Sequence, residues 1–197
     1  MKLLPVGRSA VLAEVSDAVE ALALATWARA VGVGAVEVVP AARTVLFDDV
    51  ADPAALSVRL RDWTPTSKLP SGELVEVPTT YDGPDLEFVA AAWGTDLAGV
   101  VARHSAVEYV AAFCGFAPGF SYLSGLPAEL AVPRLESPRP RVAPGSVGLA
   151  GGWCGVYPTA SPGGWRLLGR TDATLWDQAR DQPALLPPGT RVVFVPR

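Results

Sequence analysis

The first part of the chain alternates short apolar runs with longer helical patterns. Residues 10–15 (AVLAEV) have the composition of a strand, and the runs 35–39 (AVEVV) and 44–47 (TVLF) predict two more. Asp17 can cap a helix that continues to about Ala30, before Gly32 and Gly34 end it. This helix is predicted to bury one apolar stripe, made of Val19, Leu22, Ala23, Thr26, Trp27 and Ala30.

A second helix is predicted from Asp52-Pro53 to about Trp63, because proline is favoured in the first turn of a helix. Together with the strands, the two helices predict a small N-terminal α/β sandwich domain over residues 1–63, with both helices on one face of the sheet. Residues 64–73 (TPTSKLPSGE) hold two prolines, one glycine and four Ser or Thr residues without apolar periodicity. They are predicted to link this domain to the next one.

The second domain, residues 74–197, changes from a mixed pattern to a turn-rich one. It begins with a predicted strand at 74–81, helical segments near 85–93 and 95–103, and a strand at 105–113. Between Gly115 and Trp165, 10 glycines and 8 prolines exclude long helices. Short strands joined by tight turns remain, as in a β-barrel or sandwich, and residues 191–195 predict a final strand. The fold class is therefore α+β.

Composition narrows the class of protein. Hydrophobic residues make up 50% of the chain and charged residues 18%, which argues against disorder. The formal net charge is −4 and the basic residues form no block, so nucleic acid is not an expected partner. No apolar run approaches the roughly 20 residues that span a bilayer. Two cysteines are too few for a disulfide framework, and the N-terminus lacks the pattern of a signal peptide, so we expect a cytoplasmic protein without membrane contact.

Three motif blocks in the second domain resemble a known family. The first block is FCGFAPGFSYL at 113–123, followed by GLP at 125–127. The second block consists of PR at 133–134, PRPR at 138–141 and GSVGLAG at 145–151. The third block consists of VYP at 156–158, SPGGW at 161–165 and GRT at 169–171. In this order and spacing they closely resemble allophanate hydrolase subunit 1. That family is also described as the B subunit of 5-oxoprolinase and includes the sporulation kinase A inhibitor.

The resemblance implies a cyclophilin-like β-barrel in the second domain. It also implies two partners: the C subunit of the same enzyme, a protein related to allophanate hydrolase subunit 2, and a third, lactamase subunit. The complex opens a lactam to glutamate at the expense of ATP, which would be shared with the partner subunits. The same pair of modules is fused in urea carboxylase. One departure stands out: Trp153-Cys154 occupy the place where the family pattern predicts Gln-Thr, which leaves the substrate open.

Three residues are candidates for catalysis. His104 is the only histidine, and its imidazole is suited to general acid or base chemistry near neutral pH. The alternative is a histidine at a helix end that interacts with the terminal carbonyls. Arg170 can hold a carboxylate or phosphate through its planar fork, or else form a structural ion pair. Tyr122 can offer a hydroxyl for hydrogen bonding.

The turn-rich segments supply candidates for substrate or anion binding. Backbone N–H groups in such loops can bind an anion or a developing oxyanion, although the same residues can simply turn the chain. Arginines in the proline-spaced segment can meet an anionic ligand or an acidic partner, or form a solvated edge. The candidates are Pro118, Gly119, Phe120, Arg134, Arg139, Arg141, Gly145, Ser146, Ser161, Gly163 and Gly164.

Several motifs of self-sufficient enzymes are missing from the sequence. There is no G-x-x-x-x-G-K-[ST] loop for a nucleotide, no G-x-S-x-G elbow, and no spacing of histidine and cysteine that predicts a metal site. These absences favour a subunit that contributes part of a shared site. The family resemblance implies which one: a subunit of a 5-oxoprolinase complex, which shares a site with its allophanate hydrolase subunit 2-like partner and is inactive alone. Two hypotheses stay open beside it: an inhibitor of a sensor histidine kinase, and a carboxyltransferase half-module of a urea-carboxylase-type enzyme.

Overall fold

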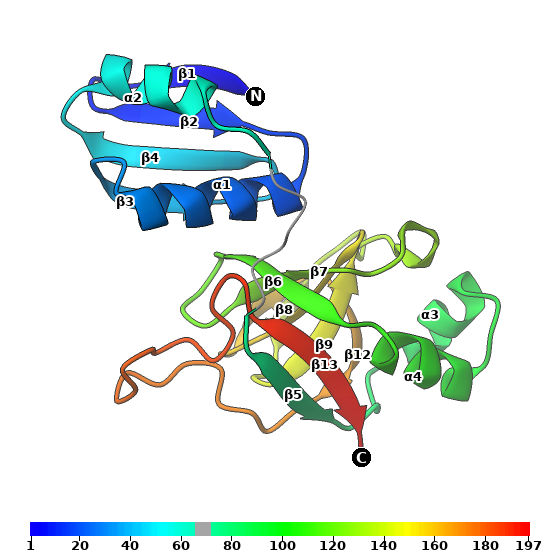
Figure 1. Cartoon of the computed structure of the whole chain (residues 1–197). Coiled ribbons are helices and arrows are strands. Elements are labelled where there is room, and N and C mark those ends of the chain that lie inside the picture. Colours follow the sequence, from blue (N-terminus) through cyan, green and yellow to red (C-terminus); the bar gives the residue numbers. More distant parts are fainter. Residues whose placement is uncertain (66–71) are drawn as a thin grey trace. The chain divides into compact units, whose positions relative to one another are not determined.

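The computed structural model describes residues 1–65 and 72–197, which fall into two compact units, residues 1–71 and residues 72–197 (Figure 1). Of the predicted linker at 64–73, residues 66–71 lie outside the described residues. The predicted α+β class is confirmed, because a mixed α/β unit is followed by a unit built on a nearly closed β-barrel.

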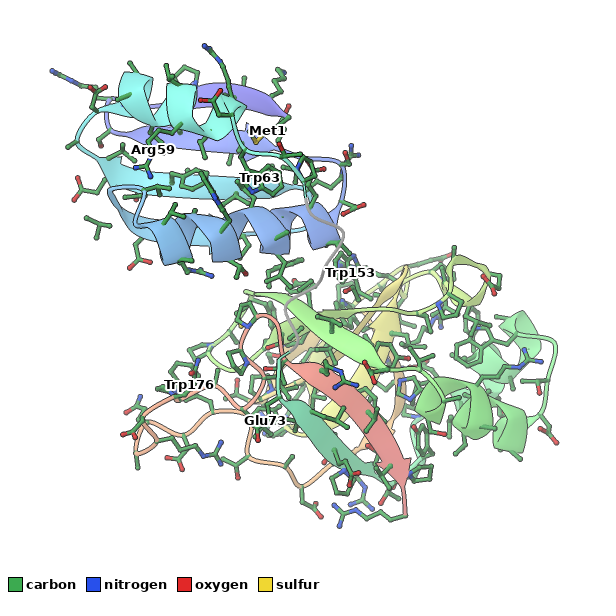
Figure 2. All side chains as sticks on the ribbon, viewed as in Figure 1. Met1, Arg59, Trp63, Glu73, Trp153 and Trp176 are labelled. Atoms are coloured by element: carbon green, nitrogen blue, oxygen red, sulfur yellow. The ribbon has the colours of Figure 1, made fainter. Side chains whose placement is uncertain are left out.

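The first unit is an antiparallel sheet covered by two helices. Its strands lie in the order β1 (Lys2–Val6), β2 (Ala10–Glu14), β4 (Thr44–Val50) and β3 (Ala35–Pro40). Helices α1 (Ala18–Val31) and α2 (Pro53–Arg61) lie over the same face, as predicted, and share one apolar core with the sheet (Figure 1). Where the chain leaves α2, Trp63 packs against Trp27 of α1, with ring centroids 6.5 Å apart (Figure 2).

Strand β1 was not predicted from the sequence. Pro5 is the last residue but one of this strand and lacks a backbone donor, which makes the segment unlike a central strand. In the structure β1 is an edge strand that pairs with β2 through a turn containing Gly7, whose φ is 59°. An edge strand tolerates proline because its outer side needs no partner.

The helix at 18–31 begins and ends as predicted, and its predicted apolar stripe is confirmed in part, since Leu22 and Ala23 are buried and Trp27 packs against the core. Asp17 caps it by accepting a hydrogen bond from the Glu20 amide, and Gly32 ends it in the left-handed region. Of the predicted stripe, Thr26 and Ala30 are exposed. Which side of α1 is buried is hard to predict from the sequence, because the helix is apolar on most of its surface. The buried residues are Ala18, Ala21, Leu22, Ala23, Leu24, Ala25 and Ala28.

The N-cap of α2 gives a local test of this unit. The Asp52 carboxylate accepts hydrogen bonds from the amides of Ala54 and Ala55 at 3.0 and 2.9 Å. Asp52→Ala should therefore lower the free energy of unfolding by about 1 kcal/mol. Asp62→Ala, at the other end of the same helix, is the control, since a carboxylate there opposes the helix dipole and its loss should not destabilise. Equal destabilisation in urea titrations of the two variants would contradict the capping role.

The second unit is built on a seven-stranded sheet that curls into a barrel (Figure 1). Around the barrel the order is β12 (Arg166–Arg170), β9 (Ser146–Ala150), β10 (Trp153–Val156), β7 (Ser121–Ser124), β6 (Tyr109–Cys114), β13 (Arg191–Pro196) and β5 (Leu74–Thr79). A separate two-stranded ribbon joins β8 (Arg139–Val142) to β11 (Ser161–Gly163).

The seam of the barrel lies between the end of β5 and strand β12. Thr80 and Arg170 exchange backbone hydrogen bonds of 2.9 Å in each direction, which joins the two edges of the sheet. Gly169 is needed at this point, because a Cβ there would come within 2.9 Å of Tyr81 Cα. The close approach of the two backbones explains a glycine that the sequence alone shows only as part of a motif.

Helices α3 (Leu86–Ala92) and α4 (Leu97–Ser105) lie beside the barrel, close to the predicted segments. The strand predicted at 105–113 begins later than expected, since α4 continues to Ser105 and β6 starts at Tyr109. Between Gly115 and Trp165 the described helical structure is a single 3-10 turn, η1 (Ala128–Leu130), as the glycine and proline content predicts. Among the described residues, none of the helices has both the length and the apolar character needed to cross a membrane.

Candidate functional site

The three motif blocks, which are far apart in the sequence, meet at one small pocket of about 110 Å³ in the second unit. The first block supplies residues from the β6–β7 loop and β7, and the second a residue after η1. The third block supplies the residue after β10, part of β11 and the turn between β11 and β12. The pocket is lined by Phe116, Phe120, Tyr122, Arg134, Tyr157, Pro162, Gly163, Gly164 and Trp165.

Aromatic rings form most of the wall. Phe120 lies edge-on to Tyr157 and to Trp165, with centroid distances of 5.5 and 5.3 Å. These three side chains are almost fully buried and form a separate aromatic core cluster. Tyr122 extends the wall, with its centroid 5.6 Å from that of Trp165. Edge-to-face packing of this kind fixes ring orientations, so the wall is largely preformed.

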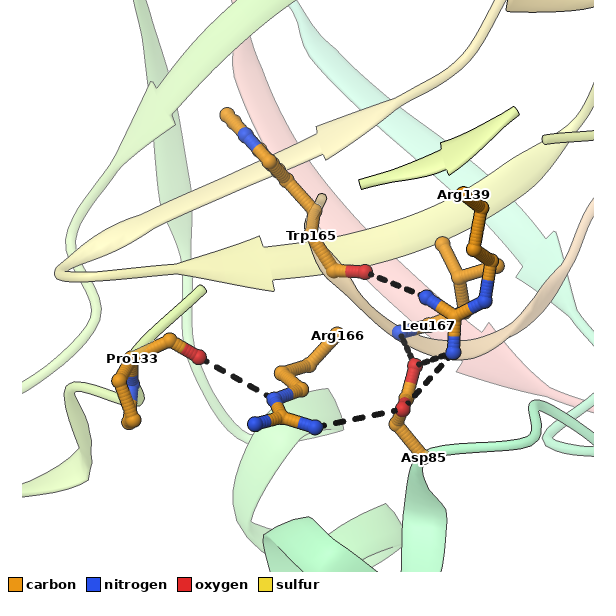
Figure 3. A network of polar contacts seen from close by, with 6 residues as sticks. All are labelled: Asp85, Pro133, Arg139, Trp165, Arg166 and Leu167. Atoms are coloured by element: carbon orange, nitrogen blue, oxygen red, sulfur yellow. Dashed lines mark hydrogen bonds and ion pairs between the residues drawn. The ribbon is translucent and has the colours of Figure 1, made fainter. Parts of the chain in front are cut away.

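A buried carboxylate holds the turn that carries Trp165 (Figure 3). Asp85, at the start of α3, accepts hydrogen bonds from Arg139 at 2.9 and 2.8 Å and from the Leu167 amide at 2.6 Å. Arg166 also points toward Asp85, at 3.6 Å. Arg139 donates to the carbonyl of Trp165 at 3.2 Å. The network therefore connects the start of α3 with β8 and with the start of β12, directly after the tryptophan.

Sequence reasoning placed Phe120, Tyr122, Arg134, Gly163 and Gly164 among the candidates, and all five line the pocket. It did not single out the other four lining residues, although they stand inside the quoted motifs: Phe116, Tyr157, Pro162 and Trp165. The available signal was the recurrence of aromatic residues within glycine- and proline-rich segments. Aromatic side chains next to tight turns are typical of a packed wall around a small ligand.

His104 lies away from this pocket, in the core of the second unit. It is fully buried at the end of α4, with its ring centroid 4.7 Å from Phe194 and 5.4 Å from Tyr109. Its Nδ1 lies 2.8 Å from the Tyr81 hydroxyl and its Nε2 3.4 Å from Cys154 Sγ. Burial lowers the pKa of His104 from 6.5 to about 3, which keeps the ring neutral. These contacts are typical of a structural histidine.

Arg170 and Arg141 are also outside the pocket lining. The Arg170 guanidinium is exposed and donates to Asp82 at 2.8 Å, and this hydrogen bond raises the pKa of Arg170 further. Arg141 is exposed on β8, whereas its neighbour Arg139 is bound to Asp85. Arg170 thus forms an exposed ion pair with Asp82, and its role in holding an anion stays a prediction.

The remaining candidates support the barrel and its loops. Gly145 has a φ of 77°, and its amide donates to the Tyr157 carbonyl at 2.7 Å, while the Ser146 carbonyl accepts from the Tyr157 amide at 2.9 Å. Gly145 and Ser146 therefore hold the backbone of the pocket residue Tyr157 in place. Gly119 fits closely against Trp176, Pro118 is exposed, and the buried hydroxyl of Ser161 has no hydrogen-bond partner among the described residues.

The two residues that depart from the family pattern lie on different sides of β10. Cys154 points into the barrel core and contacts His104, and burial raises the pKa of its thiol. Trp153 is half-buried (Figure 2) and lies edge-on to Phe113 and Tyr122, at centroid distances of 5.3 and 5.9 Å. Since Tyr122 lines the pocket, Trp153 supports the wall from outside.

No group of three or more histidine, cysteine, aspartate or glutamate side chains able to hold a metal ion occurs within residues 1–65 and 72–197. The titratable and charged groups that line the pocket are tyrosines and one arginine. Burial raises the pKa of the Tyr157 hydroxyl, so this tyrosine is a neutral donor at physiological pH.

Comparison with known proteins places the chain in a family. The family model described as carboxyltransferase domain, subdomain C and D, matches residues 1–186. The B subunit of 5-oxoprolinase from Escherichia coli is 49% identical over 144 residues, which cover 71% of this chain and 66% of that protein. The Bacillus subtilis protein of the same name is 45% identical over 125 residues, 62% of this chain and 52% of its own length. The matched part is less than two thirds of the length of either relative. These matches confirm the resemblance that was inferred from the motifs.

Solved structures agree with this fold. The crystal structure of TTHA0988 is 34% identical, with a TM-score of 0.81, over 96% of this chain and 40% of that one. The protein PH0987 from Pyrococcus horikoshii is 34% identical with a TM-score of 0.61, over 100% of this chain and 97% of that one. The Kluyveromyces lactis urea carboxylase shares the fold at 18% identity, with a TM-score of 0.72, over 23% of its length.

Proposed function

Because the chain belongs to the family described as carboxyltransferase domain, subdomain C and D, we propose that it works as one subunit of an ATP-dependent 5-oxoprolinase complex. The names of its relatives in Escherichia coli and Bacillus subtilis support this assignment. In the proposed reaction a cyclic amide, 5-oxoproline, is opened to glutamate with ATP hydrolysis. The partners are the C subunit, related to allophanate hydrolase subunit 2, and a third, lactamase subunit.

The meeting of three distant motif blocks at one pocket is the observation that carries this proposal. The lining consists of aromatic rings, glycines, a proline and one guanidinium, which are groups that hold and orient a ligand. General acid or base catalysis at neutral pH is usually the work of histidine, carboxylates or lysine. We therefore assign binding and orientation to this chain, with a hydrogen bond from the Tyr122 hydroxyl, and proton transfer to the partners.

The pocket does not fit ATP. Its volume of about 110 Å³ lies well below the roughly 300–1,000 Å³ of pockets that hold drug-sized ligands. A nucleotide also needs several phosphate-binding groups, whereas this pocket has a single guanidinium. We propose that the nucleotide is held by the partner subunits, and that this chain takes part in no step on ATP itself.

Reconstitution tests the proposed function. The purified chain, its allophanate hydrolase subunit 2-like partner and the lactamase partner are mixed with 5-oxoproline and ATP, and glutamate release is measured. We expect turnover from the complete mixture, and none from this chain alone or from the mixture that lacks it. Full activity without this chain, or turnover by this chain unaided, would refute the proposal.

The fold likeness to urea carboxylase and the description of the matching family favour one second candidate, a half-module for carboxyl transfer. It requires a biotinylated carrier protein as carboxyl donor. Transfer of labelled carboxyl from such a carrier to an amide, in the presence of this chain and its partner, would favour the second candidate over the first. The hypothesis of kinase inhibition stays an untested prediction.

A further inference from the structure

The pocket, at about 110 Å³, has the size of a site for a small ring. Phe120, Tyr157 and Trp165 form its buried wall, and they are 2%, 2% and 4% exposed. Behind this wall, a Cβ on Gly155 would come within 3.0 Å of both Phe120 and Trp165. The two rings are therefore packed directly on backbone, and the wall has little room to move outward. A pocket of about 110 Å³ with a fixed wall selects ligands of few atoms.

Phe116 is held over this wall in a strained conformation. Its φ is 70°, a value that bulky residues rarely adopt, and the Ala117 amide donates to the Gly115 carbonyl at 2.8 Å across it. The ring stays 60% exposed while lying edge-on to Phe120 and Tyr157, at centroid distances of 5.2 and 6.1 Å. Such strain persists only where the surroundings enforce it, and it concentrates at ligand sites.

Arg134 places a positive charge at the pocket without a carboxylate to neutralise it. The side chain is exposed, and its Cζ lies 6.0 Å from the centroid of the Trp165 ring. Among the described residues Arg134 takes part in no ion pair, whereas the nearby Arg139 and Arg166 both pair with Asp85. The guanidinium is therefore available for an anion, and its planar fork suits a carboxylate.

We propose that this pocket binds a small ring carrying one carboxylate, with the ring against the aromatic wall and the carboxylate on Arg134. The inference rests on the proposed function for its choice of ring, a five-membered lactam. It goes further in assigning the binding site to this chain alone, without ATP or a partner. The aromatic faces contact the ring, and the tyrosine hydroxyls at the wall, on Tyr122 and Tyr157, are the donors within the lining for the lactam oxygen.

Ligand-observed NMR titration of the full chain tests the site. The probes are 5-oxoproline and 2-pyrrolidinone, which has the same lactam ring without the carboxylate. Arg134→Met should weaken 5-oxoproline binding roughly 10- to 100-fold, the loss expected for a charge-assisted hydrogen bond, and leave 2-pyrrolidinone binding unchanged. Arg134→Lys should recover part of the affinity, because it restores charge but not the fork. Arg59→Met, an exposed arginine of the first unit, is the matched control and should bind like the wild type.

Three results would overturn the inference: no saturable binding of 5-oxoproline by the wild type, equal affinity of the Arg134→Met variant, or an equal loss for the probe without a carboxylate. The reconstituted complex separates this inference from the proposed function. If the complex turns over 5-oxoproline and Arg134→Met leaves its KM unchanged, the site is wrong and the function stands. If the chain binds as expected but the complex releases no glutamate, the function is wrong and the site stands.

Discussion

Replacing Asp85 with alanine is expected to lower the free energy of unfolding of the second unit by about 3–5 kcal/mol. Arg139 and Arg166 would lose their counter-ion although their side chains are only 26% and 15% exposed. The Leu167 amide would also lose its acceptor, which is now 2.6 Å away. Removing Asp85 leaves these guanidinium groups without a counter-ion at a place that water reaches only in part, so the loss exceeds the net value of the ion pair itself.

Asp82→Ala is the matched control, since its partner Arg170 lies at the same 2.8 Å but both side chains are solvent-exposed. Exposed pairs contribute at most about 1 kcal/mol, so this variant should unfold close to the wild type. Because the chain has two units, unfolding is best followed by urea-dependent hydrogen exchange of peptides from residues 72–197. Similar losses for the two variants would mean that burial of the Asp85 network does not matter.

The chain is expected to lose stability on mild acidification because of His104. Its pKa is about 3 when folded, against 6.5 for the unperturbed group, so between these values only the unfolded chain binds the proton. The contribution is fully present above pH 6.5 and decreases as the pH falls toward 3. At 1.36 kcal/mol per unit, the free energy of unfolding should fall by about 2 kcal/mol between pH 7 and 5.

The slope of stability against pH checks this expectation. His104 is the only histidine, so few other groups titrate between pH 6.5 and 5. A His104→Gln variant should be less stable at pH 7, because its amide cannot match the contacts to Tyr81 and Cys154. The free energy of unfolding of this variant should nevertheless no longer depend on pH between pH 6.5 and 5. A slope that persists in the variant would show that other groups cause it.

Local signals in the sequence predicted both ends of α1 and the start of α2. Asp17 and Asp52 both cap helices, and Gly32 ends one of them in the left-handed region, as their residue types indicate. The buried face of α1 was predicted only in part, because a helix that is apolar on most sides does not show in its sequence which side faces the core. Strand β1 was not predicted: a segment with Pro5 fits only an edge strand, and the edge position appears only once the sheet is assembled.

The residues of the pocket were also predictable from the sequence only in part. The motif blocks contained every residue that lines the pocket, but nothing local separates a wall residue such as Trp165 from a residue that only turns the chain. The role of Asp85 depends on Arg139 and Arg166, which are distant in sequence and give no periodic signal. The burial of His104 did have a signal: it lies four residues after Val100, on the inner face of α4.

The parallel pairing of β5 with β13 has a consequence for biosynthesis. β13 lies between β5 and β6, so the first strand of the barrel to leave the ribosome waits for the last one before its ladder can form. Until then, the facing edges of β5 and β6 stay open to pairing with other chains. Assembly that depends on such distant contacts is slow, and the nascent polypeptide is most exposed to aggregation, or most in need of a chaperone, during this interval.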